Sequence, residues 1–107
     1  MKKKILIIIL ILVIIFSIPF VYVEVGKRKL YKRTFNYLTN VRGYEKNEFK
    51  IENPRHSFIN RILSYPEWGI DVVFKDEPTR VYMYTYDLSD NNIIQYGGVN
   101  GKHFEAD

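Results

Sequence analysis

The chain has 107 residues, a net charge of +4 and no cysteine, which limits it to one small domain and an N-terminal apolar segment. The absence of cysteine excludes a disulfide framework, a thiolate nucleophile and a cysteine-based metal site. The positive charge does not indicate a nucleic-acid-binding protein, because the basic residues flank the apolar segment and residues 44–107 are slightly acidic.

Residues 5–23 form an apolar run without a charged side chain. As a helix this run is roughly 28 Å long, close to the hydrocarbon core of a bilayer at about 30 Å. A signal-peptide core is shorter and is followed by a cleavage site of small residues, whereas the only alanine of this chain is Ala106. We therefore interpret residues 1–24 as an uncleaved signal-anchor, and cleavage followed by secretion is the alternative.

Basic residues flank both ends of the apolar run. They are Lys2, Lys3, Lys4, Lys27, Arg28, Lys29, Lys32 and Arg33. The numbers of Lys and Arg residues on the two sides are nearly equal, so the positive-inside rule alone does not decide the orientation. Three lysines directly before an apolar run are, however, the layout of an export signal. We predict a single-pass protein of the cell membrane, with a cytoplasmic N-terminus and an extracytoplasmic domain at residues 25–107.

Residues 24–42 have the periodicity of an amphipathic helix. Apolar residues recur at three- and four-residue spacing, at Leu30, Tyr31, Phe35, Leu38 and Val41. Gly43 follows the last of them, as is typical of a glycine just beyond a helix C-terminus. We expect this helix to continue out of the membrane-spanning segment, with a weak joint at Gly26.

The remainder of the chain alternates between strand patterns and turn residues. Short strands are predicted at residues 48–52, 69–75, 79–86 and 93–96, before a glycine-bearing tail. The second and third should form a hairpin across "KDEPT", and "NPRH" should end the first. Residues 57–65 fit a helical turn or a long loop. The expected fold is α+β, with the helix packed on an antiparallel meander of about three to four strands.

The side chains that most often carry catalysis are scattered in this sequence. His56 and His103, the only histidines, lie in loop-like segments without an acidic residue at metal-ligand spacing, so we expect both at the surface. The serines lack the setting of a nucleophile elbow. We predict no catalytic, cofactor-binding or metal-binding residue, and we do not expect an enzyme.

The strand predicted at residues 79–86 has a row of aromatic residues on one face. This face holds Arg80, Tyr82, Tyr84 and Tyr86, and the other holds Val81, Met83 and Thr85. If the second face is buried, the tyrosines form an exposed partner-binding face, a role that amphipathic rings suit. The alternatives are that the tyrosines belong to the core or pair across strands to stabilise the sheet.

The whole chain resembles a family of short bacterial proteins, mostly from low-GC Gram-positive organisms, called domain of unknown function 3139. The matching features are the "MKKKILIIILILVII" start, the helix that ends in "YLTNVRGYEK" and the "VVFKDEPTRVYMYTYD" hairpin. This resemblance implies a membrane-anchored or exported small domain. It implies no known activity, so no functional residue is transferred from it.

These observations predict an anchored protein whose small extracytoplasmic domain binds something at the bacterial cell envelope. The expected partners are the lipid bilayer and another membrane or envelope protein, and nucleic acid is not expected. One alternative is a secreted inhibitor-like domain, released by cleavage of the signal. Another is an accessory or immunity-type subunit of a membrane complex. The sequence leaves the oligomeric state open.

Overall fold

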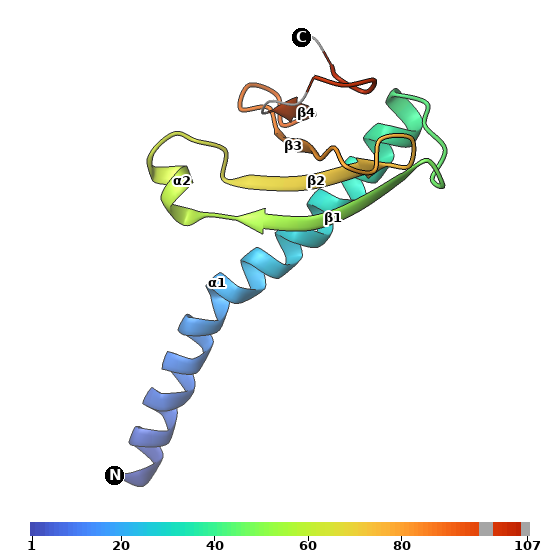
Figure 1. Cartoon of the computed structure of the whole chain (residues 1–107). Coiled ribbons are helices and arrows are strands. Elements are labelled where there is room, and N and C mark those ends of the chain that lie inside the picture. Colours follow the sequence, from blue (N-terminus) through green and yellow to red (C-terminus); the bar gives the residue numbers. More distant parts are fainter. Residues whose placement is uncertain (97–99, 106–107) are drawn as a thin grey trace.

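The computed structural model describes residues 1–96 and 100–105 and joins one long helix to a small sheet (Figure 1). The helical elements are α1 (Lys2–Asn36), a π-helical turn η1 (Tyr37–Val41) and α2 (Phe58–Ile62). The strands are β1 (Phe49–His56), β2 (Trp68–Phe74), β3 (Tyr82–Tyr86) and β4 (Ile93–Tyr96). The predicted α+β class is confirmed. Part of the glycine-bearing tail, residues 97–99 and 106–107, lies outside the described residues.

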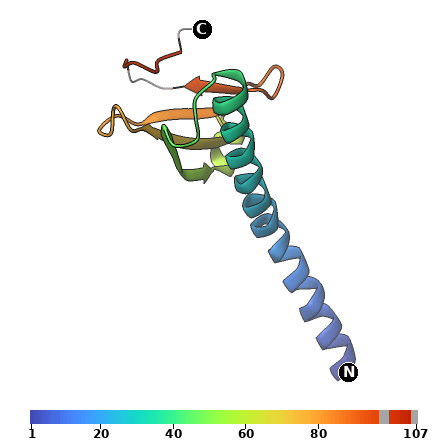
Figure 2. The same cartoon turned by 90° about the vertical axis from the view of Figure 1, so that its right-hand side faces the viewer.

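The two halves of α1 have different surroundings. The N-terminal half projects away from the sheet and has no buried residue (Figures 1 and 2). Among the described residues, α1 is the one helix that is long and apolar enough to cross a membrane. The C-terminal half lies against the sheet and buries Leu30 and Thr34. The joint expected at Gly26 is absent, because α1 continues through it without interruption. Gly43 has a φ of 77°, which confirms the predicted glycine beyond the helix C-terminus.

The described strands form an antiparallel meander in the order β1-β2-β3-β4. The predicted hairpin is confirmed: Ile70 pairs with Tyr84 and Val72 with Tyr82. The strand expected to end at "NPRH" instead runs on to His56, because a register shift between Glu52 and Arg55 accommodates the proline.

The segment at residues 57–65 is a helical turn followed by a loop, which decides between the two options that the sequence left open. Ser57 is the N-cap of α2, and its hydroxyl oxygen accepts a hydrogen bond from the backbone N–H of Asn60 at 3.2 Å. No residue of α2 is buried.

The tyrosine-bearing face of β3 is part of the core, so the hypothesis of an exposed partner-binding face is wrong. Tyr82 is 1% exposed and Tyr84 0%, whereas Val81 on the other face is 40% exposed. The phenol groups keep their hydrogen bonds on burial, because Tyr82 donates to Glu77 at 2.7 Å and Tyr84 to Glu105 at 3.0 Å. The alternative, in which the tyrosines form the core face, is therefore correct for these two residues.

Candidate functional site

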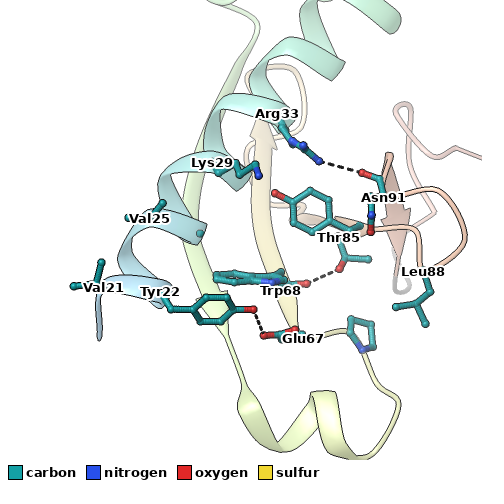
Figure 3. Close-up of a pocket in the computed structure, with 13 residues that line it drawn as sticks. Val21, Tyr22, Val25, Lys29, Arg33, Glu67, Trp68, Thr85, Leu88 and Asn91 are labelled. Atoms are coloured by element: carbon teal, nitrogen blue, oxygen red, sulfur yellow. Dashed lines mark hydrogen bonds between the residues drawn. The ribbon is translucent and has the colours of Figure 1, made fainter. Parts of the chain in front are cut away.

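A cleft of about 630 Å³ separates α1 from the ends of β2 and β3 (Figure 3). It begins beside the last residues of the apolar run and extends up the domain along α1. Its three parts are a wall formed by one face of α1, a floor formed by Trp68, and a far wall formed by β3 and the loop before β4.

The α1 wall changes from apolar to cationic along its length. Val21, Val25, Lys29 and Arg33 recur every four residues and therefore share one face of the helix. The two valines are 58% and 57% exposed, and both lie at the end of the cleft nearest to the apolar run. The two cations lie farther up, as Figure 3 shows.

Arg33 connects the α1 wall to the far wall. Its Nη1 donates a hydrogen bond to the backbone carbonyl of Asn91 at 3.4 Å, and its guanidinium lies 5.5 Å from the centre of the Tyr86 ring. Burial raises the pKa of the Tyr86 phenol, so this ring is neutral at physiological pH. The guanidinium therefore meets an aromatic face and a carbonyl, and no carboxylate neutralises it within the described residues.

The floor of the cleft depends on a close approach between α1 and β2. A Cβ atom on Gly26 would lie only 2.0 Å from the indole of Trp68, so glycine is what allows this ring to lie against the helix. The hydroxyl of Thr85 donates to the Trp68 carbonyl at 2.5 Å and holds the strand end in place. Trp68 is also the only tryptophan of the chain.

A polar cluster closes the lower end of the cleft. Tyr22, in the last turn of the apolar run, donates to Glu67 at 2.9 Å, and its ring centre lies 5.6 Å from that of Trp68. His56 contacts the same carboxylate at 2.5 Å, and its side chain is 3% exposed. The expectation that His56 is a surface residue is therefore wrong. Its acidic partner, Glu67, directly precedes β2 and is brought to His56 by the pairing of β1 with β2, so the spacing in the sequence did not reveal it.

His103 is likewise not a surface residue. Its ring stacks on Phe74 with centres 3.7 Å apart, and its two nitrogens lie 2.9 Å from the Tyr44 hydroxyl and 2.8 Å from Asp76. The hydrogen bond with His103 lowers the pKa of the Asp76 carboxyl. This cluster lies at the end of the domain far from the apolar run.

Asp76, Glu77 and His103 place their ligand atoms within 4.8 Å of one another, as a metal site would require. Each of these groups already has partners in the protein: Glu77 accepts from Tyr82 at 2.7 Å and from the backbone N–H of Lys102 at 2.9 Å. The Tyr82 hydrogen bond lowers the pKa of Glu77. The arrangement holds residues 101–105 against the sheet, and we assign it a structural role.

The residues singled out from the sequence do not form one surface. Arg80 precedes β3 and pairs at 3.1 Å with Glu77, the carboxylate that also accepts from the buried Tyr82, whereas Tyr86 lines the cleft. The flanking cations also separate: Lys29 and Arg33 face the cleft, Lys27, Arg28 and Lys32 line a shallow groove elsewhere on α1, and Lys2, Lys3 and Lys4 lie at the far N-terminal end.

The sequence interpretation missed the cleft itself. The residues not recognised were Val21, Val25, Trp68, Leu88 and Asn91. The four-residue spacing of Val21, Val25, Lys29 and Arg33 was a usable signal for one wall. The far wall had no local signal, because it forms only when the sheet folds.

The comparisons with known proteins identify the family of the chain. No curated protein matches the chain, and no solved structure matches it. The family model described as protein of unknown function (DUF3139) matches residues 1–84, which include α1, β1, α2, β2 and the first half of β3. The chain therefore belongs to the DUF3139 family of proteins of unknown function.

Proposed function

We propose that this protein is a single-pass protein of the cell membrane whose extracytoplasmic domain is a binding module of the cell envelope and not an enzyme. Its N-terminal helix has the length and composition to cross a bilayer, and Lys2, Lys3 and Lys4 favour a cytoplasmic N-terminus. Tyr22 supports retention of this helix. Cleavage after the apolar run would remove its hydrogen bond to Glu67 and its contact with Trp68.

The observation that carries the proposal is the change of polarity along the cleft. Its lower wall, Val21 and Val25, lies at the end of the apolar run, and its upper wall has Lys29 and Arg33. Lys29 is six residues beyond Val23, which is about 9 Å of helix, and its flexible side chain reaches back toward the headgroup layer. We infer that the ligand is an amphiphile with an acidic headgroup, of the class of anionic phospholipids.

In this arrangement each part of the ligand meets a matching surface. The hydrocarbon part lies against Val21, Val25 and the face of Trp68, where burial of apolar surface is favourable. The acidic headgroup lies between Lys29 and Arg33, and Arg33 has no carboxylate partner to displace within the described residues. Glu67 does not compete for these cations, because it is already bonded to Tyr22 and His56.

The ligand is testable because Trp68 is the only tryptophan and forms the floor of the cleft. The full chain is reconstituted into phosphatidylcholine vesicles, which contain no other tryptophan, with an increasing fraction of phosphatidylglycerol, and Trp68 emission is recorded. We expect a saturable change that Lys29→Gln and Arg33→Gln shift several-fold toward higher phosphatidylglycerol. Arg28→Gln is the matched control, because Arg28 lies in the same stretch of α1 but outside the cleft.

Equal effects of the three substitutions would contradict a defined site. That result would mean a general attraction of basic residues to an anionic surface, which is worth about 1 kcal/mol per cation wherever it lies.

The topology has a separate test. A reporter that is active only outside the cytoplasm, fused after Asp107, should be active, and the intact mass should retain residues 1–24. A reporter active only in the cytoplasm would contradict the proposed orientation.

A further inference from the structure

The segment between β1 and β2 exposes an unusual concentration of apolar side chains. Five of its eight residues at 58–65 are large, hydrophobic and exposed: Phe58 (46%), Ile59 (68%), Ile62 (81%), Leu63 (57%) and Tyr65 (62%). We call these five residues the apolar lobe. Single exposed hydrophobic residues are common, but a contiguous group of this kind marks a surface that something else covers.

The apolar lobe lies beside the point where α1 leaves its apolar run. The ring of Phe58 stacks on that of Tyr22, with centres 6.1 Å apart and an angle of 24° between the ring planes. Tyr22 is the second-last residue of the apolar run, so Phe58 is level with the end of the membrane-spanning segment. Figure 1 shows α2 at the end of the sheet from which the N-terminal half of α1 projects.

We propose that the apolar lobe is a second membrane contact, which inserts into the interfacial layer of the leaflet from which α1 emerges. Its partner is the lipid bilayer. This proposal rests on the single-pass anchoring proposed above and does not depend on the ligand of the cleft. The composition suits an interface: aliphatic side chains provide apolar area, Tyr65 is amphipathic, and Arg61 is a cation whose side chain is 66% exposed.

A second contact changes what the anchor can do. A single helix tethers the domain but leaves its tilt and rotation free, and spanning helices tilt by about 20° on average. A tilt toward α2 brings the apolar lobe into the interfacial layer and fixes the orientation of the domain. Pro66, Glu67 and Trp68 follow the lobe directly and line the cleft, so the same contact holds the apolar end of the cleft against lipid.

The absence of cysteine allows a direct test on the full chain. Ile62→Cys and Val41→Cys are spin-labelled separately, and each full chain is placed in nanodiscs at one chain per disc. Val41 is the matched control: Ile62 is 81% and Val41 71% exposed, and Val41 ends η1, far from the apolar run and outside the cleft. We expect oxygen to relax the label at position 62 several-fold more effectively, relative to a water-soluble nickel chelate, than the label at position 41.

A third label, at Val13→Cys inside the apolar run, separates failure of the lobe from failure of the anchor. Lipid exposure at positions 13 and 62 together with water exposure at position 41 supports the proposal. Lipid exposure at position 13 but water exposure at position 62 overturns it and leaves the anchoring intact, and it would then favour a protein as the occupant. Water exposure at both positions overturns the anchoring and the lobe proposal together.

Discussion

The two ends of the domain that α1 and the sheet form contain similar residues but differ in how completely these are covered: one end lies beside the apolar run, the membrane side under the proposed anchoring, and the other lies far from it. At the far end, Phe74 packs against Tyr44, Tyr82 and His103, with ring centres between 3.7 and 5.4 Å apart. The polar atoms of this cluster find partners within the protein. At the membrane-side end, the aromatic residues Tyr22 and Trp68 border an open cleft, and the apolar lobe beside them is exposed.

This difference indicates which surface is complete by itself. At the far end, the polar atoms of the cluster have partners within the protein, and the Phe74 ring is fully covered. The membrane-side end leaves apolar surface on α1, on the cleft floor and on α2, and all of it lies at the level where the apolar run ends. A bilayer and a bound amphiphile would cover this surface, whereas water would not. The following substitutions test this contrast.

The largest effect is expected from Phe74→Ala at the far end. Phe74 is 0% exposed and its ring packs against those of Tyr44, Phe49, Tyr82 and His103, so its loss leaves a cavity. We expect a loss of about 3–5 kcal/mol in the free energy of unfolding, measured by denaturant titration of the full chain in detergent. Leu88→Ala, in the exposed loop at the open end, should change it by less than about 0.5 kcal/mol. Similar losses for both would contradict the contrast.

A smaller effect is expected from Gly26→Ala at the membrane-side end. The new methyl group overlaps the Trp68 ring, so the indole must move away from α1. We expect a loss of about 1–3 kcal/mol from this crowding, partly offset by the higher helix propensity of alanine, and a red shift of Trp68 emission.

Gly43→Ala is the control for this substitution. Gly43 has a φ of 77° and open space around its Cα, so alanine there is strained but crowds nothing. It should cost about 1 kcal/mol without changing Trp68 emission. A more stable Gly26→Ala variant with unchanged emission would show that the close approach does not shape the cleft.

The parts of the fold that depend on local periodicity could be predicted from the sequence. The three- and four-residue spacing from Leu30 to Leu38 and the alternation at residues 69–75 report helix and strand directly, because each period corresponds to one buried face. The turn at "KDEPT" then leaves the hairpin as the simplest connection. The burial of Tyr82 and Tyr84 could not be decided in this way, since both faces of β3 carry hydrophobic residues.

The missed features all depend on partners that are distant in the sequence. The carboxylate that pairs with His56 is 11 residues away, and the one that pairs with His103 is 27 residues away, so spacing rules gave no signal. The cleft requires Gly26 to meet Trp68 across α1 and β2. A glycine in a helix indicated a joint, whereas its actual role is to allow a close approach, and only the tertiary contact distinguishes the two.

The polar cluster at the far end predicts a specific dependence of stability on pH. The hydrogen bond from Tyr82 holds the pKa of Glu77 below its ordinary value of 4.5. The ionised carboxylate therefore stabilises the fold above about pH 4.5, and this contribution is lost as the pH falls through the lowered pKa of the folded state. Asp76, whose pKa His103 lowers, acts in the same direction.

Denaturation midpoints of the full chain between pH 7 and pH 3 should fall for the wild type, and Glu77→Gln should be less stable at pH 7 and less sensitive to acid. Glu24→Gln, on the exposed surface of α1, should show the same change of denaturation midpoint with pH as the wild type. If the midpoint of Glu77→Gln changed with pH as much as that of the wild type, the hydrogen bonds of Glu77 would not be what stabilises this end of the domain.

The smallest difference concerns one substitution made at two buried threonines, for which the expected effects have opposite signs. Thr34, on the core face of α1, is 0% exposed, and its hydroxyl has no hydrogen-bond partner within the described residues. Thr34→Val removes an unsatisfied polar atom and should stabilise the protein by up to about 1 kcal/mol. Thr85→Val should instead cost about 1–3 kcal/mol, because it leaves the Trp68 carbonyl without the hydroxyl that now donates to it at 2.5 Å. Thermal unfolding of both variants, with Trp68 emission as a second readout, measures this difference. If Thr85→Val were the milder change, the cleft floor would be held by the packing of Trp68 on Gly26 and not by its hydrogen bond.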